Sequence, residues 1–223
     1  AILGAPNVGK STLLNRIVGT KVSIVSAKVQ TTRTRVLGIA LDGAAQLIFI
    51  DTPGIFLPKR RLDRAMVAAA WGGAGDADRI LLLIDSKKGV DPDTQLIIDK
   101  LLRQGGRSVD LVLNKIDLVD KQKLLGLTET LNNYGIFDKI YMVSAEKGDG
   151  VGDLVSYLKS KIPLSPWLFP EDQISDMPMR LLAAEITREQ LFIKLHQELP
   201  YAATVETETW QEKDDGSIRI EQI

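Results

Sequence analysis

Short apolar runs that alternate with helical patterns restrict the fold of this chain more than any other feature. The runs end at Leu3, Asp85, Asn114 and Ser144, and a polar loop and an amphipathic stretch follow each of them. Runs this short are typical of buried strands rather than of helix cores. Strands joined through helices in this way predict an α/β fold, with a mostly parallel sheet covered by helices on both faces.

Two further β-rich runs lie between the first and second helical patterns. They cover residues 36–41 and 47–51 and surround Asp42-Gly43, a dipeptide that favours a tight turn. We therefore expect a hairpin at this point of the chain.

The pattern changes after residue 163, which indicates a domain boundary. The stretch 162–172 contains three prolines, and proline continues neither a helix nor a central strand. We expect a first domain over 1–163, a linker over 164–177 and a second domain over 178–223. The second domain shows one helical pattern, 179–199, and one hairpin, which is too little for a core of its own. It is therefore expected to be incomplete.

Composition excludes several classes of protein. The net charge of −1 gives no general attraction to nucleic acid or to acidic membranes, so any RNA contact needs a local basic patch. The absence of cysteine excludes disulfides and thiolate metal sites. No apolar run reaches the roughly 18 residues that a transmembrane helix needs.

The segment GAPNVGKS, residues 4–11, matches the pattern of a phosphate-binding loop. Glycines let successive backbone N–H groups converge on an anion, and the following helix adds the positive end of its dipole. Lys10 is expected to bridge the terminal phosphates, and the hydroxyl of Ser11 is expected to ligate Mg²⁺. The strand before and the helix after the segment are the context that this motif requires.

A second motif, DTPG, ends a strand at residues 51–54. Its carboxylate, Asp51, is expected to reach the magnesium ion through a water molecule. The N–H of Gly54 is expected to contact the γ-phosphate. Taken alone, the motif is more often a plain turn, so its value comes from its pairing with the phosphate loop.

Two more loops follow later strands and predict recognition of guanine. In NKID, residues 114–117, Asp117 can accept hydrogen bonds from the N1–H and the exocyclic amine of guanine, which adenine does not offer in that arrangement. Lys115 can cover the face of the base, and Asn114 can tie this loop to the phosphate loop. In SAE, residues 144–146, the N–H of Ala145 is a candidate donor to guanine O6.

These motifs, in this order, resemble the translation-factor-like GTPases, and further segments narrow the resemblance to the Era family. Those segments are KVQTTR (28–33), PEDQISD (170–176), AAEITREQL (183–191) and ELPYAATVE (198–206). The resemblance covers essentially the whole chain. It implies hydrolysis of GTP to GDP and phosphate with Mg²⁺ as cofactor. The nucleotide-binding residues that follow from it are Gly4, Asn7, Val8, Gly9, Lys10, Ser11, Thr12, Asp51, Gly54, Asn114, Lys115, Asp117, Ser144 and Ala145.

The resemblance also assigns a first switch to residues 30–33. A threonine there coordinates Mg²⁺ only when the γ-phosphate is present. We expect Thr32 to be this ligand, beside Ser11 and Asp51, with Thr31 as the alternative. Lys10, Asn7, Thr32 and Gly54 form the expected catalytic set.

Two departures from common GTPase patterns qualify the expected activity. The residue after DTPG is Ile55, whereas GTPases such as Ras orient the attacking water with a glutamine at this position. Slow intrinsic hydrolysis is therefore expected, and a K⁺ ion held by Asn7 is a hypothesis for the missing charge. The alternative is a module that binds guanine nucleotides without hydrolysing them. The second departure is the glycine-rich stretch 71–76, which predicts a short or frayed helix.

The resemblance implies a KH domain that binds the 3′ end of small-subunit ribosomal RNA, within a precursor of the 30S particle. KH domains clamp RNA with a GXXG loop, and no such loop follows residue 177. Little RNA binding is therefore expected of residues 1–223 alone. A cytoplasmic location with a peripheral contact at the inner membrane is also suggested for the family, although the sequence shows no amphipathic anchor.

Overall fold

The computed structural model describes residues 1–26, 28, 31–32, 34–195 and 203–223. Gln30 and Arg33 of the predicted switch lie outside the described residues. The same holds for residues 196–202, which contain the expected end of the helix 179–199 and the start of ELPYAATVE.

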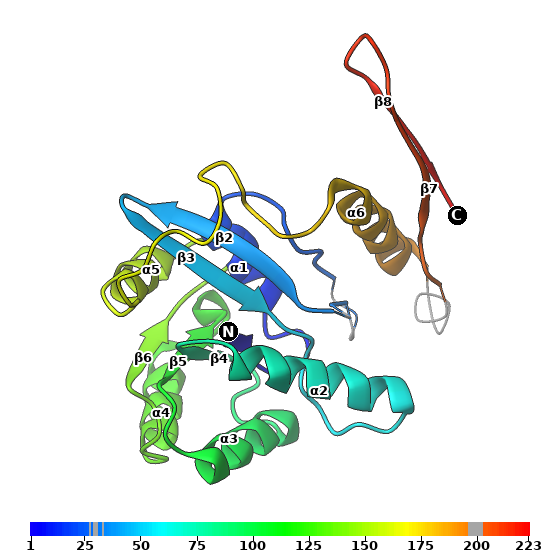
Figure 1. Ribbon diagram of the computed structural model, residues 1–223. Helices are drawn as coiled ribbons and strands as arrows, with labels where there is room; N and C mark the ends of the chain where they lie inside the picture. The colour runs from blue at the N-terminus through cyan, green and yellow to red at the C-terminus, as the bar shows by residue number, and fades with distance from the viewer. Residues whose placement is uncertain (27, 29–30, 33, 196–202) are drawn as a thin grey trace.

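One six-stranded sheet organises the first domain (Figure 1). Its strand order is β2-β3-β1-β4-β5-β6, and within this sheet the β2–β3 pair is antiparallel while the other described pairs are parallel. The predicted α/β fold and its hairpin are thus confirmed. The strands are β1 (Ile2–Leu3), β2 (Val36–Asp42), β3 (Ala45–Asp51), β4 (Ile80–Asp85), β5 (Val109–Asn114) and β6 (Lys139–Met142).

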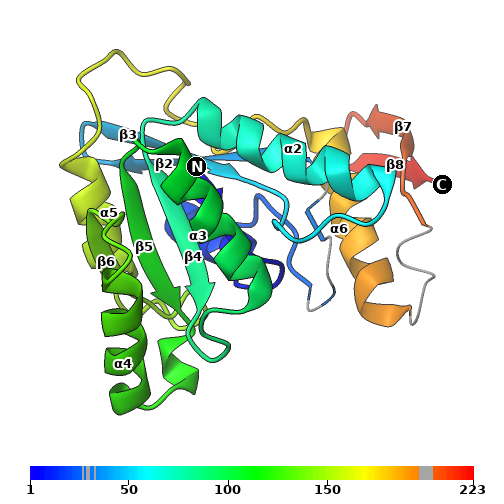
Figure 2. The ribbon, with the colours of Figure 1, turned by 90° about the horizontal axis from the view of Figure 1, so that it is seen from below.

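Helices cover both faces of this sheet (Figures 1 and 2). Along β4, Leu81 and Leu83 face one core while Leu82 and Ile84 face the other, as the alternation of side chains in a strand requires. The first core contains α1 (Lys10–Val18) and α5 (Val151–Lys159); the second contains α2 (Arg61–Gly75), α3 (Pro92–Gln104) and α4 (Lys121–Asn132). No helix in the described part of the chain is long and apolar enough to cross a membrane.

The helix α2 contradicts the expectation of a short or frayed element, because it runs without interruption from Arg61 to Gly75. The glycines have a packing role that the sequence did not reveal. A Cβ atom on Gly73 would lie 3.2 Å from Ile50 Cγ2 and 3.3 Å from Thr52 Cγ2, so glycine allows the helix to lie close to β3. This contact offsets the low helix propensity of glycine.

The stretch after residue 163 lies along the outer strand β2. The N–H of Ile39 donates to the carbonyl of Ile174 at 2.9 Å, and Ser175 Oγ donates to the carbonyl of Leu37 at 2.8 Å. The end of the proposed linker is therefore attached to β2 by regular hydrogen bonds.

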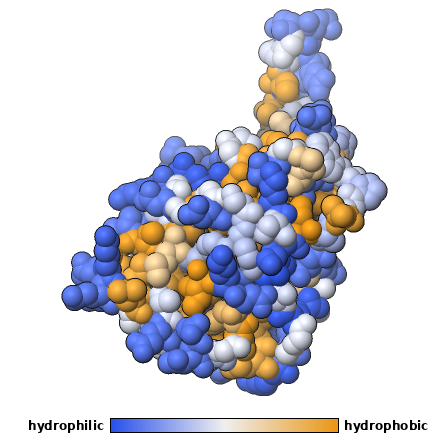
Figure 3. All heavy atoms as spheres, turned by 90° about the vertical axis from the view of Figure 1, so that its left-hand side faces the viewer, coloured by the Kyte–Doolittle hydropathy of each residue, from blue (hydrophilic) through white to orange (hydrophobic). Residues whose placement is uncertain are grey.

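Beyond the linker, α6 (Met179–Lys194) is followed by an antiparallel pair of strands, β7 (Thr207–Glu212) and β8 (Ile218–Gln222). The helix ends earlier than the expected Leu199, because Leu195 is already extended. The β7–β8 hairpin projects from the rest of the described molecule (Figures 1 and 3). The boundaries 1–163, 164–177 and 178–223 stay a proposal.

Two neighbouring glycines of α2 provide a test of the packing explanation. Gly72 has open space where a Cβ would lie, whereas Gly73 faces β3. Gly72→Ala is expected to raise the free energy of unfolding by about 1 kcal/mol through helix propensity alone. Gly73→Ala should gain none of this, because its methyl group crowds Ile50 and Thr52. Equal gains for the two variants in urea denaturation would contradict the explanation.

Candidate functional site

Four loops meet at the carboxyl edge, the edge of the sheet at which the parallel strands end. They follow β1, β3, β5 and β6, and each carries one of the sequence motifs. A cavity of about 440 Å³ is lined by residues of the first three of these loops. Its lining includes residues 9–12, Asn7, Thr32, Gly54 and Lys115. The structure therefore brings most of the predicted site residues to one place.

The phosphate loop has the conformation that its glycines allow. Gly9 has φ +98° and precedes α1, and a Cβ there would lie 2.3 Å from Asn114 Nδ2. Lys10 folds back over the loop, with Nζ 3.2 Å from the carbonyl of Gly4 and 3.0 Å from that of Ala5. Burial lowers the pKa of Lys10 to about 8, against the charge of Asp51, which raises it. An anion seated in the loop would therefore stabilise the protonated ammonium.

Asp51 and its neighbours form an oxygen-rich group below the loop. Asp51 is fully buried, and its Oδ2 accepts hydrogen bonds from Ser11 Oγ at 2.6 Å and Ser23 Oγ at 2.9 Å. Its Oδ1 has no hydrogen-bond partner among the described residues, and burial raises the pKa of this carboxyl. Thr32 Oγ1 lies 3.2 Å from Ser11 Oγ.

These atoms fit a magnesium ion. Mg²⁺ prefers oxygen ligands and binds through one or two carboxylates together with phosphates and water. Thr32 approaches Ser11, whereas Thr31 Oγ1 donates to the carbonyl of Lys28 at 2.8 Å. Of the two threonines, Thr32 is thus the better placed for a shared ion.

Asn114 connects three of the loops. Its Nδ2 donates to the carbonyl of Val8 at 2.8 Å, and its Oδ1 accepts from the N–H of Ala145 at 2.9 Å. The tie between NKID and the phosphate loop is therefore present. The contact of Ala145 was not foreseen: its N–H already donates to Asn114, so a bond to guanine O6 requires that donor to be shared.

Lys115 and Asp117 belong to the same motif as Asn114 and have separate contacts. Lys115 has φ +63°, and its Nζ contacts the carbonyl of Asn7 at 2.8 Å and Asp85 Oδ2 at 2.7 Å. Its stem therefore lies across the gap between two loops. The Ser144 hydroxyl donates to Asp117 and lowers the pKa of that carboxyl. Asp117 is thereby kept ionised, which is the form that accepts two hydrogen bonds.

The DTPG segment is fastened directly to the phosphate loop. The N–H of Ile55 donates to the carbonyl of Gly4 at 3.1 Å, and a Cβ on Gly54 would lie 2.9 Å from Pro6 Cα. The side chain of Ile55 is fully buried in the core of α2, α3 and β4. The position that holds a glutamine in Ras-like proteins is thus a packing residue here.

Two site residues were missed by sequence reasoning. Asp85 ends β4 and holds Lys115, and its place at the end of a strand was a usable signal. Ser23 belongs to no motif, and only the fold brings its hydroxyl to Asp51. Nothing in the local sequence distinguishes Ser23 from other serines in polar loops.

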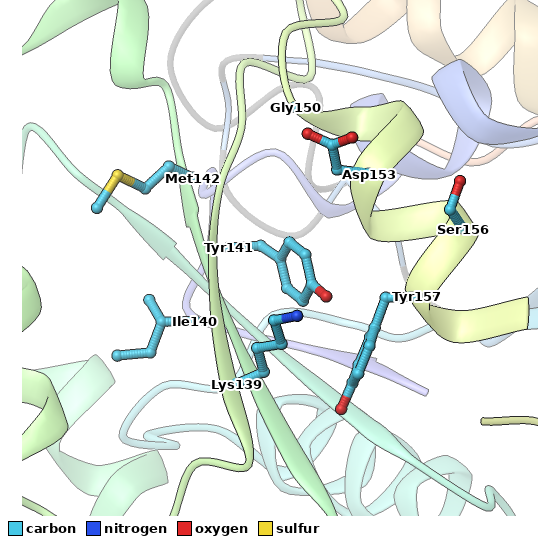
Figure 4. Close-up of a pocket in the computed structure, with 8 residues that line it drawn as sticks. All are labelled: Lys139, Ile140, Tyr141, Met142, Gly150, Asp153, Ser156 and Tyr157. Carbon is cyan, nitrogen blue, oxygen red and sulfur yellow. The ribbon is translucent and has the colours of Figure 1, made fainter. Parts of the chain in front are cut away.

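A second cavity, of about 580 Å³, lies along β6 and α5 and shares no lining residue with the first (Figure 4). Tyr141, Tyr157 and Lys139 gather on its lining, and the two rings lie 5.3 Å apart. The Tyr157 hydroxyl donates to Asp110, and burial raises the pKa of this tyrosine to about 12. None of the sequence motifs for nucleotide binding reaches this cavity, so we assign the chemistry to the first one.

Comparisons with known proteins agree on one family. A family model described as 50S ribosome-binding GTPase matches residues 1–115. GTPase Era of Rhizobium meliloti is 58% identical over 223 residues, which are 100% of this chain and 71% of that protein. A crystal structure of Era in complex with MgGDPNP and nucleotides 1506–1542 of 16S ribosomal RNA has a TM-score of 0.93 and 39% identity. The match covers 99% of this chain and 76% of that one.

The double role of Asn114 predicts a large loss of stability when its side chain is removed. Asn114→Ala leaves the buried carbonyl of Val8 and the N–H of Ala145 without partners, at a cost of about 2 kcal/mol. Thermal denaturation without nucleotide measures this effect. Asn133→Ala, at an exposed helix end, serves as the control and should change the melting temperature little. Similar melting temperatures for both variants would contradict the assigned role.

Proposed function

This chain belongs to the GTPase Era family, and on that premise we propose that it is a GTP-hydrolysing switch in the maturation and assembly of the small ribosomal subunit. The observation that carries the proposal is the convergence of three motif-bearing loops on one cavity, to which Asn114 ties the fourth loop through the N–H of Ala145. The known Era complex with MgGDPNP supports the choice of nucleotide and metal.

In the proposed reaction, water attacks the γ-phosphate in line with the leaving group. Ser11, Thr32 and, through water, Asp51 would hold the magnesium ion, which supplies positive charge to the phosphate oxygens. The ammonium of Lys10 would exchange the carbonyls of Gly4 and Ala5 for phosphate oxygens. The N–H of Gly54 is the proposed donor to the γ-phosphate, and such fixed donors stabilise developing charge.

Selection of the base rests on Asp117. Its side chain is 13% exposed, with Ser144 and Lys147 beside it. Its two acceptor oxygens match the N1–H and the amine of guanine. Adenine would leave these oxygens unpaired, which is a strong basis for rejection.

The buried Ile55 leaves the attacking water without the usual side-chain partner. We propose that a K⁺ ion near Asn7 contributes the missing positive charge. Asn7 lines the cavity in a left-handed conformation with φ +63°, which asparagine tolerates better than most residues. Because Ile55 cannot orient the attacking water, hydrolysis is expected to be slow in the absence of an activator.

The proposed macromolecular partner is the 3′ end of small-subunit ribosomal RNA within the pre-30S particle. The Era complex with a 16S ribosomal RNA fragment supports this class of partner. The proposed partner places the protein in the cytoplasm, where small subunits are assembled. The peripheral contact with the inner membrane stays a prediction for the family.

A module that binds GTP without hydrolysing it is the competing function. The buried Ile55 is the observation in its favour. Family membership supports hydrolysis, and a single-turnover assay with Mg²⁺ separates the two. Release of phosphate from GTP but not from ATP supports the switch; binding of GTP without release supports the competing module.

Replacing one carboxylate oxygen of Asp117 by an amide nitrogen should change which base the protein prefers. Asp117→Asn replaces an acceptor oxygen by an amide donor, which matches the 2-oxo group of xanthine rather than the amine of guanine. We expect affinity for GDP to fall more than about tenfold and affinity for xanthosine diphosphate to rise. Calorimetric titration with both nucleotides measures this exchange. Unchanged preference would show that Asp117 does not contact the base.

The potassium hypothesis predicts a salt-specific rate. Wild-type turnover in KCl should exceed that in NaCl at equal ionic strength, whereas Asn7→Ala should lose most of this difference and still bind GDP. Equal turnover in both salts for wild type would exclude the proposed ion. A difference that survives in Asn7→Ala would place the ion elsewhere.

A further inference from the structure

The segment that follows α1 is fixed to that helix by a single side chain. Asn15 Oδ1 accepts the N–H of Val22 at 2.9 Å and that of Ser23 at 3.0 Å, while its Nδ2 donates to the carbonyl of Ser23 at 2.7 Å. Three hydrogen bonds thus determine where the backbone of Ser23 lies. The position of its side chain is correspondingly well defined.

That side chain is directed at the buried carboxylate of β3. Ser23 is 3% exposed, and its Oγ donates to Asp51 Oδ2 at 2.9 Å. Ser11 Oγ donates to the same oxygen at 2.6 Å, whereas Oδ1 has no partner among the described residues. One oxygen of the carboxylate is therefore held from two sides and the other is left open.

We propose that Ser23 is a positioning residue for magnesium binding, which keeps Asp51 Oδ2 engaged so that Oδ1 stays available to the ion's water shell. This inference rests on the proposed function, in which Ser11 is a magnesium ligand. Ser11 must serve both the ion and Asp51, whereas Ser23 serves Asp51 alone. Ser23 therefore supplies an independent restraint on the rotation of the carboxylate, a torsion that is otherwise broad.

The expected size of the effect on magnesium affinity can be taken from residues that orient ligands in other metal sites. Residues that orient a ligand from behind typically change metal affinity by about 10- to 100-fold when they are removed. The effect should therefore appear in the magnesium requirement. It should not appear in the interaction of the protein with nucleotide alone, because Ser23 is 3% exposed and its hydroxyl is directed at Asp51.

The experiment measures release of a fluorescent GDP analogue as a function of free Mg²⁺. For Ser23→Ala, the magnesium concentration that half-maximally slows release should rise about tenfold over wild type. The release rate in excess EDTA should be equal for both proteins. Ser23→Cys, which keeps the approximate shape but donates only weakly, should shift in the same direction and separates hydrogen bonding from packing.

Tyr157→Phe is a matched control for the general cost of such a deletion. It also removes a hydroxyl that donates to a fully buried carboxylate, Asp110, at 3.0 Å. This carboxylate lies at the opposite end of the sheet, since Asp110 is the second residue of β5 and Asn114 is the last. The control should lower the melting temperature but leave the magnesium requirement unchanged.

The outcomes distinguish this inference from the function on which it rests. If release from the wild type does not depend on Mg²⁺, the proposed magnesium site itself is wrong. If the wild type responds and folded Ser23→Ala and Ser23→Cys follow the same curve, Ser23 has no positioning role. If Tyr157→Phe shifts the curve as far as Ser23→Ala does, the effect is a general loss of stability and the inference also fails.

Discussion

The burial of Lys10 and Asp51 at the carboxyl edge is the constraint on which the rest of the site depends. Burial disfavours both charged forms: it lowers the pKa of the lysine to about 8 and raises that of the aspartate. Each charge is only partly compensated, by backbone carbonyls in one case and by two hydroxyls in the other. A magnesium-bound polyphosphate brings the missing charges of both signs. The sheet therefore maintains a site whose electrostatics are complete only with its ligand.

The sequence predicted those parts of the molecule in which local pattern and position coincide. Short apolar runs that alternate with helical patterns predicted the sheet. The motif loops follow strands that run parallel, so the ends of these strands lie at one edge. Contacts set by tertiary approach were not predictable. In the sequence, Gly73 suggests a break in the helix, and only the structure shows that it packs against β3. Ser23 likewise looks like any loop serine, and only the structure shows its bond to Asp51. The N–H of Ala145, a predicted donor to the base, also donates to Asn114, and the sequence did not reveal this bond because hydrogen-bond competition depends on distances that no motif encodes.

Helix α6 contacts both the segment that follows α1 and the predicted first switch. Glu189 of α6 accepts the N–H of Val25 at 2.8 Å and pairs with Lys21. Arg188 donates to the carbonyl of Thr31 at 2.7 Å. The residues on either side of Ser23, and the neighbour of Thr32, are therefore held by one helix. Thr31, which Arg188 holds, is the residue next to Thr32, so the positions of α6 and of this proposed magnesium ligand are linked.

Two buried carboxylates on strands of one sheet show how stability and function are separated in space. Asp110, near the start of β5, has both oxygens satisfied: Oδ2 by Arg79 at 2.8 Å and Oδ1 by the Tyr157 hydroxyl at 3.0 Å. Asp51, at the end of β3, has one oxygen without a partner among the described residues. A buried charge with complete hydrogen bonding resists change. A buried charge with one open oxygen is costly to maintain, so its persistence at the carboxyl edge is best explained by a ligand that completes it.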